Sequence, residues 1–89
     1  MKNILENATI IDVRMPEEFS ISHYPNAICI PLHELPQRLG EIKKMKQPIV
    51  AYCRSGNRSG IAVSILKQNG LTEVFNGGGL TDLLQQKNN

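Results

Sequence analysis

The sequence predicts one α/β domain in which a central, mostly parallel sheet lies between two layers of helices. The chain has 89 residues, which is enough for one hydrophobic core but not for two. Short apolar runs alternate with segments whose apolar residues recur at helical spacing. The runs are rich in β-branched residues and do not alternate with polar ones, as is typical of strands buried on both faces. We therefore expect residues 1–89 to form a single domain.

The first half of the chain contains two predicted strands, each followed by a helix. Residues 8–13 and 27–30 are the apolar runs. Pro16 and the two acidic residues after it predict a helix start, because proline and carboxylates suit the first turn of a helix. Residues 32–42 have leucine and isoleucine at helical spacing. Pro36 within them predicts a first turn or a break, because proline disrupts a helix interior.

The next segment is predicted to be a strand at residues 49–52, a polar loop and a helix. Apolar residues at helical spacing follow the loop, with Ser59 as the predicted N-cap and Gly70 as the predicted stop signal. This order places the loop between the end of a central strand and the beginning of a helix.

The last segment is predicted to contain a short strand at residues 73–75 and a closing helix at residues 80–86. The glycines at 77–79 lie between these two elements, and no lysine follows them at P-loop spacing. We therefore expect the glycines to form a tight turn rather than a phosphate-binding loop.

The polar loop at residues 53–59 contains the candidate chemistry. Its backbone N–H groups should converge on an anion at its centre, because the loop leads into a helix N-terminus. We expect these groups, the helix dipole and nearby guanidinium groups to lower the pKa of Cys53 and favour a nucleophilic thiolate. Gly56 allows the backbone to turn, while Arg54 and Arg58 can bind an oxyanion through forked hydrogen bonds.

The predicted site consists of one catalytic residue and the rest of its loop. The catalytic residue is Cys53. The predicted substrate-binding residues are Arg54, Ser55, Gly56, Asn57, Arg58 and Ser59.

This loop resembles the active-site loop of the rhodanese family, the sulfurtransferases that carry sulfur as a cysteine persulfide. The match extends over nearly the whole chain, so the resemblance implies the three-layer α/β/α rhodanese-like fold. The other matching segments are Asp12-Val13-Arg14, Glu18-Phe19, Ser22-His23, Asn26-Ala27, Ile30-Pro31-Leu32 and Asn76-Gly77-Gly78-Gly79.

The length of the loop distinguishes sulfur transfer from the chemistry of related phosphatases and arsenate reductases. Cys53 and Arg58 are separated by four residues, whereas the related phosphatases and arsenate reductases use Cys-x5-Arg around a phosphate-sized oxyanion. A shorter loop implies a smaller cradle, so the resemblance favours a sulfur atom over Cys53 rather than a phosphoryl group. A Cys-dependent phosphatase or arsenate reductase is kept as a minor alternative.

The resemblance implies a thiosulfate sulfurtransferase that needs no cofactor. The Cys53 thiolate would attack the sulfane sulfur of a small anionic donor such as thiosulfate, and sulfite would leave a Cys53 persulfide behind. Cyanide in vitro, or a thiol or protein acceptor in the cell, would then take the outer sulfur. Two alternatives stay open, namely a non-catalytic rhodanese-like binding module and a persulfide carrier that is loaded by a partner protein.

Composition argues against several other classes of function. The net charge is only +2, and the basic residues are scattered apart from a short lysine run, so we expect no nucleic-acid partner. No apolar stretch approaches the roughly 20 residues that a spanning helix needs, so we expect no membrane association. The N-terminal residues lack the apolar centre of a signal peptide, which predicts a cytoplasmic location unless a leader was removed. The two cysteines lack zinc-ligand spacing, so no metal is expected.

Several other conspicuous side chains have structural interpretations. Cys29 lies between two isoleucines in a predicted strand, and we expect buried packing rather than a resolving thiol. Asp12 and Arg14 lie at the end of another predicted strand, where a buried ion pair between them would hold the sheet end and the neighbouring loops. His23 is expected to form a local hydrogen bond rather than to act as a general base for Cys53.

Overall fold

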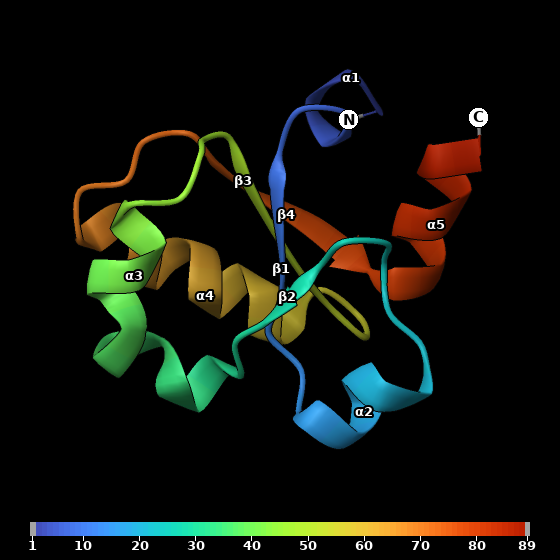
Figure 1. Cartoon of the computed structure of the whole chain (residues 1–89), viewed down its shortest axis with the longest axis horizontal. Helices are drawn as coiled ribbons and strands as arrows, with labels where there is room; N and C mark the ends of the chain where they lie inside the picture. The colour runs from blue at the N-terminus through green and yellow to red at the C-terminus, as the bar shows by residue number, and fades with distance from the viewer. Residues whose placement is uncertain (1, 89) are drawn as a thin grey trace.

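A parallel four-stranded sheet forms the centre of the computed structural model, which describes residues 2–88 (Figure 1). The spatial order of the strands is β2-β1-β3-β4, and every neighbouring pair is parallel. This arrangement confirms the predicted α/β class. The strands are β1 (Thr9–Asp12), β2 (Ile28–Cys29), β3 (Ile49–Cys53) and β4 (Val74–Gly79).

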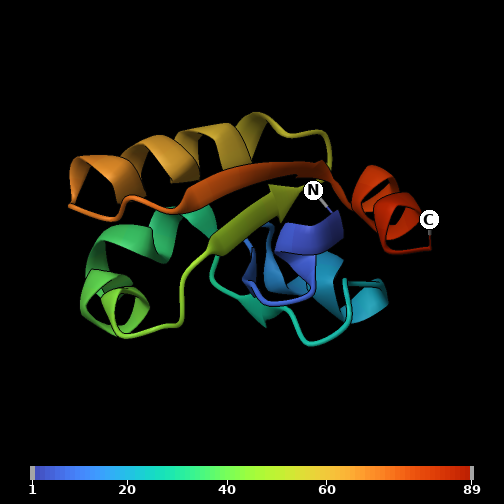
Figure 2. The same cartoon turned by 90° about the horizontal axis from the view of Figure 1, so that it is seen from above.

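Helices cover both faces of this sheet. Side chains of α3 and α4 pack in one core cluster, and side chains of α1 and α5 pack in the other. In Figure 2, α3 (green) and α5 (red) lie at opposite ends of the view. The helical segments within the described residues are α1 (Lys2–Leu5), α2 (Pro16–Ile21), the 3-10 helix η1 (Leu32–Arg38), α3 (Leu39–Lys43), α4 (Asn57–Gln68) and α5 (Leu80–Asn88). None of them is long and apolar enough to cross a membrane.

Strand β3 shows how the sheet divides the core. All of its residues are buried, and successive side chains point to opposite faces. Ile49 and Ala51 pack in the cluster beneath η1, α3 and α4, whereas Val50 and Tyr52 pack in the cluster beneath α1 and α5. The apolar run without polar alternation is therefore the signature of a strand covered on both faces, and the three-layer architecture is confirmed.

One edge of the sheet gathers the segments that concern function. Because all strand pairs are parallel, the carboxyl ends of the four strands meet at this edge. The loop after β3 and helix α2 lie here, while both termini lie toward the opposite end of the sheet (Figure 1). In open α/β sheets ligands bind outside the carboxyl ends of the strands, so a ligand site is expected at this edge.

The prediction that Ser59 caps α4 is wrong. The helix begins at Asn57, and Gly56, three residues before Ser59, occupies the N-cap position with a φ of 99°. Ser59 lies inside the first turn, where its hydroxyl contacts the side chains of Cys53 and Asn76 instead of a helix N–H group. Those two partners come from the strands next to the helix, so a search for local capping patterns could not identify them. The stop signal is confirmed, since Gly70 follows the C-cap residue of α4.

The prediction of a tight turn at residues 77–79 is also wrong. These glycines are the last residues of β4, where Gly78 pairs with Tyr52 and Gly79 pairs with Cys53 after a register irregularity. A Cβ atom on Gly79 would collide with the carbonyl group of Arg54. Glycine therefore serves here to let β4 run directly beside the loop that follows β3.

The remaining differences concern the lengths of elements. Residues 32–42 form two helical segments rather than one, and Pro36 lies inside the 3-10 segment η1. Proline lacks an N–H group and clashes with the preceding turn, so the α-helix begins only after it. Strand β2 is two residues long, shorter than residues 27–30, and α1 was not predicted at all.

Candidate active site

Cys53 ends the strand that lies second from one side of the sheet. It is the last residue of β3, which is flanked by β1 on one side and β4 on the other. Its side chain is only 1% exposed and belongs to the core cluster on the α4 face. The thiol is therefore held by a rigid, doubly paired strand rather than by a free loop.

The backbone after Cys53 closes around its sulfur. The N–H group of Gly56 donates to Cys53 Sγ at 2.9 Å, and the N–H group of Ser59 donates to the same atom at 3.5 Å. The Ser59 hydroxyl oxygen lies 3.4 Å from Sγ, and its one proton can be donated either to Sγ or to Asn76 Oδ1, which lies 2.7 Å away. Hydrogen-bond donors directed at one sulfur favour the negatively charged thiolate.

The pKa of Cys53 is the balance of two opposing effects. Burial raises the pKa, because a thiolate loses hydration in the core. Hydrogen bonds from the Ser59 side chain and from the backbone N–H groups of Ser55, Gly56 and Ser59 lower it. The hydrogen bonds outweigh burial, so the pKa of Cys53 lies below its ordinary value. Low thiol pKa values of this kind accompany reactive cysteines.

Gly56 makes this closure possible. Its φ of 99° lies in the left-handed region, which residues with a Cβ atom rarely adopt. That conformation turns its N–H group back toward Cys53 while the next residue begins α4. The glycine in the loop motif thus has a defined backbone role.

Asn76 is a residue of this site that sequence reasoning missed. Its Oδ1 accepts hydrogen bonds from the Ser59 hydroxyl at 2.7 Å and from the N–H group of Gly78 at 2.9 Å. Its Nδ2 donates to the carbonyl of Gly56 at 3.1 Å. One amide on β4 therefore fixes both the loop and the serine that contacts Cys53. Its position near the carboxyl end of a predicted strand was the available signal, since such ends meet at one edge of the sheet.

Arg58 is paired with a carboxylate from another helix. Its Nη1 and Nη2 atoms donate to Oε1 and Oε2 of Glu18 at 2.8 and 3.1 Å, which joins α4 to α2. The Arg58 guanidinium lowers the pKa of Glu18 to about 2. The Glu18 carboxylate in turn raises the pKa of Arg58, and the charge of Cys53 contributes to the same shift. Sequence reasoning did not identify Glu18 as part of the site.

Arg54 is exposed and lines a hollow of about 260 Å³ beside the loop. Within residues 2–88 it forms no ion pair with a carboxylate. The other residues around the hollow come from the β1–α2 segment and from the start of α5. They are Arg14, Glu18, Ile21, Ser22, Leu80 and Thr81.

The structure thus divides the predicted loop residues into groups. Gly56 and Ser59 contact Cys53 directly, whereas the side chains of Ser55 and Asn57 are exposed. No three His, Cys, Asp or Glu side chains of the described chain gather as a metal site requires.

The predicted scaffold pair beside the site is confirmed. Arg14 Nη2 donates to Asp12 Oδ2 at 2.6 Å, and both side chains are buried. The Tyr52 hydroxyl donates to the same carboxylate at 2.7 Å and accepts a hydrogen bond from the Tyr24 N–H group. This network joins β1 and β3 to the segment after α2, as expected for a sheet-end scaffold.

His23 and Cys29 lie outside the loop. His23 Nδ1 lies 2.9 Å from the carbonyl oxygen of Phe19, so the predicted local hydrogen bond is confirmed. Cys29 is half-buried at the end of β2, and its Sγ lies 3.9 Å from the Arg14 carbonyl. Burial and the neighbouring carboxylates raise the pKa of Cys29.

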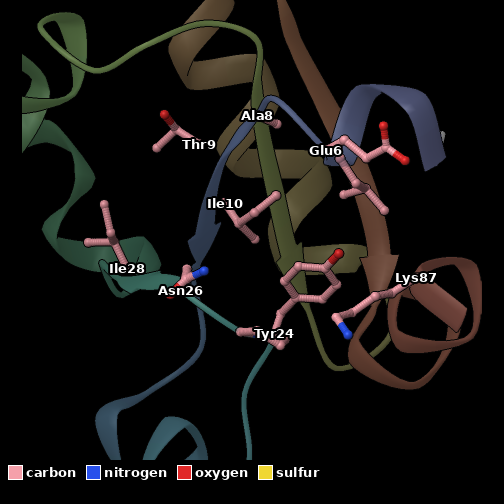
Figure 3. A pocket seen from close by; sticks show the side chains of 10 residues that line it. Glu6, Ala8, Thr9, Ile10, Tyr24, Asn26, Ile28 and Lys87 are labelled. Carbon is pink, nitrogen blue, oxygen red and sulfur yellow. The ribbon is translucent and has the colours of Figure 1, made fainter.

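A larger hollow of about 490 Å³ lies away from the loop (Figure 3). Leu5, Ile10 and Tyr24 contribute apolar lining, and Figure 3 shows Glu6 and Lys87 among the other lining side chains. It contains no residue of the loop at 53–59. The larger of the two hollows is therefore not the one beside Cys53.

Comparison with known proteins gives consistent matches across the chain. Residues 1–85 match the family model described as Rhodanese-like domain. The chain is 42% identical over 78 residues to a protein of Escherichia coli (strain K12) named thiosulfate sulfurtransferase PspE. This match covers 86% of the chain and 75% of PspE.

Two further comparisons concern a second relative and a solved structure. The chain is 46% identical over 69 residues to the uncharacterized protein YqhL of Bacillus subtilis (strain 168), a match covering 78% of the chain and 54% of YqhL. The chain therefore spans about half the length of that relative. A solved structure described as rhodanese with anions from E. coli has 39% sequence identity and a TM-score of 0.77. That match covers 84% of the chain and 89% of the solved one.

Proposed function

The chain belongs to the rhodanese-like domain family, and from that premise we propose that it is a sulfurtransferase that carries sulfur as a persulfide on Cys53. The observation that carries this proposal is the closure of hydrogen-bond donors around one buried sulfur. A nucleophilic thiolate needs such stabilisation, because burial alone would keep the thiol protonated. The name of PspE supports thiosulfate as the first donor to test.

The first proposed step loads Cys53 with sulfur. The Cys53 thiolate attacks the outer sulfur of thiosulfate, a new S–S bond forms, and the S–S bond of thiosulfate breaks. Sulfite leaves with the electron pair of the broken bond, so no external oxidant or reductant is required. The N–H groups of Gly56 and Ser59 are positioned to stabilise the anionic persulfide that results.

The second proposed step unloads Cys53. An acceptor thiolate, or cyanide in vitro, attacks the outer sulfur and breaks the S–S bond to Cys53. The electron pair returns to Cys53, which leaves as a thiolate and is ready for another donor. The hydrogen bonds that lower the pKa of Cys53 also make it a good leaving group in this step.

The arginines supply charge for the anionic reactants. Arg54 is exposed and lines the hollow beside the loop, where it can meet a donor through forked hydrogen bonds. Arg58 contributes through the same loop but already holds Glu18. A solved structure that is 39% identical in sequence is described as rhodanese with anions, which supports anionic reactants as the first to test.

Intact mass provides the test. The reduced protein is exposed to thiosulfate beside the Cys53→Ser and Cys29→Ser variants, and cyanide is then added. We expect one added sulfur on the parent chain and on Cys29→Ser but none on Cys53→Ser, with thiocyanate released from the loaded forms. Absence of both adduct and thiocyanate would overturn thiosulfate as the donor.

Two further reagents separate the alternatives. Sulfur gained only from a persulfide-donating protein would indicate a partner-loaded carrier. Cys53-dependent turnover of an aryl phosphate would instead indicate a phosphatase. A chain that takes sulfur from neither donor and hydrolyses no phosphate would be a binding module.

A further inference from the structure

Three arginines belong to the loop and to the hollow beside it, and two of them are already paired. Arg14 pairs with Asp12 at 2.6 Å, and Arg58 pairs with Glu18 at 2.8 Å. Within residues 2–88, Arg54 has no such carboxylate partner. The site therefore contains two neutralised guanidinium groups and a single uncompensated one.

The charge balance follows from this pairing. When Cys53 is a thiolate, its negative charge offsets the positive charge of Arg54, and the two ion pairs add nothing. The formal charges of Cys53 and of these paired and unpaired side chains then sum to zero, so a dianion meets no net positive side-chain charge there. Removal of one carboxylate from the pairs would leave a net charge of one positive unit.

We propose that Glu18 is a specificity-determining residue of this site, which disfavours dianions relative to neutral and singly charged reactants by pairing with Arg58. The inference rests on the proposed function in one respect, since it concerns the charge of the reactants at the same Cys53. It predicts that thiosulfate, a dianion, binds less tightly than the loop and its arginines alone would permit.

The geometry of the pair supports this role. Both carboxylate oxygens of Glu18 accept hydrogen bonds from Arg58, so the Nη1 and Nη2 atoms are already engaged. Glu18 also lines the hollow that Arg54 lines, which places a negative charge where a reactant would enter. The side chains of Glu18 and Arg58 are 30% and 35% exposed, so solvent and salt reach the pair and moderate its effect.

Alkylation of Cys53 tests the proposal without any sulfur transfer. Iodoacetate carries a negative charge and iodoacetamide carries none. In both reagents the thiolate attacks the carbon that bears iodine, an S–C bond forms, and iodide leaves. The ratio of their rates therefore reports how strongly the site attracts an anion, because changes in the fraction of thiolate cancel. Every protein carries Cys29→Ser, so that only Cys53 reacts.

Glu18→Gln is the informative variant, because glutamine keeps an oxygen to accept the Met15 N–H bond that Glu18 accepts at 3.0 Å. We expect the iodoacetate-to-iodoacetamide ratio to rise about fivefold at low salt, as for loss of one partly exposed charge contact. The increase should shrink at about 1 M salt, where the screening length falls to roughly 3 Å. The KM for thiosulfate should fall by a larger factor than the alkylation ratio rises, because a dianion interacts twice as strongly.

Two matched variants control for other causes. Glu17→Gln changes the net charge equally on the same helix, but Glu17 is exposed and does not contact the loop. Glu18→Asp keeps the charge while shortening the side chain. We expect both to retain the parent alkylation ratio to within about twofold, since an exposed charge that does not pair with Arg58 and a retained charge change little.

The outcomes separate this proposal from the proposed function. An alkylation ratio that is unchanged or lower in Glu18→Gln, or that rises equally in Glu17→Gln, would overturn the role of Glu18. A raised ratio in a protein that transfers no sulfur would instead overturn the proposed function while leaving the electrostatic inference standing.

Discussion

Cys53 and Cys29 end two strands of the same parallel sheet, with β1 between them, yet their sulfur atoms have opposite surroundings. The Cys53 sulfur accepts hydrogen bonds from the backbone after it, and its pKa is lowered despite burial. The Cys29 sulfur lies near a carbonyl oxygen, which cannot stabilise a thiolate, and burial raises its pKa. The difference arises in the segment after each strand rather than in the strand itself.

These two segments explain the contrast. After Cys53, Gly56 turns the chain back and donates its own N–H group to the sulfur, and the first turn of α4 directs the N–H group of Ser59 toward the same atom. After Cys29, the chain continues through Pro31, which has no N–H group to donate. Of these two cysteines, the one followed by a turn with backbone donors has the lowered pKa.

The largest predicted effect is on sulfur transfer itself. Cys53→Ser should reduce thiocyanate formation more than about a thousandfold, because loss of a nucleophile removes the covalent route. Cys29→Ser should change the same rate less than about twofold, as expected for a residue outside the reacting group. The measurement is the initial rate with thiosulfate and cyanide. A large loss of rate in Cys29→Ser would show that both cysteines take part in sulfur transfer, which would contradict the contrast between Cys53 and Cys29.

The second prediction concerns the free energy of unfolding and Asp12, the last residue of β1 between the two cysteine-bearing strands. Asp12→Asn should lower the free energy of unfolding by about 3–5 kcal/mol, because it leaves the buried Arg14 guanidinium uncompensated. Urea unfolding followed by circular dichroism measures this change. Glu41→Gln is the control, because Glu41 pairs with Arg38 at the surface, and its loss should alter stability far less. Equal losses in both variants would contradict the scaffold role of Asp12.

A smaller effect is expected from the side chain that completes the donor set. Ser59→Ala should raise the pKa of Cys53, because it removes the hydroxyl contact at 3.4 Å and leaves burial less opposed. The rate of alkylation by iodoacetamide at pH 7 should fall roughly tenfold, as for a hydrogen bond to a charged group worth about 1.5 kcal/mol. Ser64→Ala on the exposed face of α4 is the control and should leave the rate unchanged. An unchanged alkylation rate in Ser59→Ala would show that the backbone N–H groups alone account for the low pKa of Cys53.

The smallest effect is a difference between two pH profiles. Only the thiolate reacts, so each alkylation rate rises with pH through the pKa of its cysteine and then levels off. The profile of Cys53, measured in Cys29→Ser, should reach half of its plateau at a lower pH than the profile of Cys29, measured in Cys53→Ser. The hydrogen bonds lower the pKa of Cys53, whereas burial raises the pKa of Cys29. Coincident profiles would remove the distinction between the two sulfur environments.

Much of the fold follows from patterns that are local in the sequence. The β-branched runs became β1 and β3, Pro16 begins α2, and Gly70 follows α4. These signals depend on neighbouring residues, because propensity, helix capping and apolar spacing act over a few positions. The same kind of pattern located the loop that begins at Cys53.

Other parts of the site depend on distant residues. Ser59 meets Asn76 across 17 positions, and Arg58 meets Glu18 across 40. The glycines at 77–79 end β4 beside β3, and the space around Gly77 and Gly79 is already filled. A Cβ atom on Gly79 would collide with the Arg54 carbonyl, and one on Gly77 would collide with the Val50 side chain. No local rule specifies these partners. The predictions of an N-cap at Ser59 and of a tight turn at residues 77–79 were therefore wrong.

The sequence by itself determined the fold class, the position of the nucleophile candidate and the glycine that lets its loop turn. Those features depend on residue type and short-range spacing, which a chain carries whether it is folded or not. Only the tertiary structure decided that Ser59 contacts both Cys53 and Asn76 and that Glu18 forms an ion pair with Arg58. Such contacts arise when parallel strands bring their carboxyl ends to one edge, because that arrangement joins segments that lie far apart along the chain.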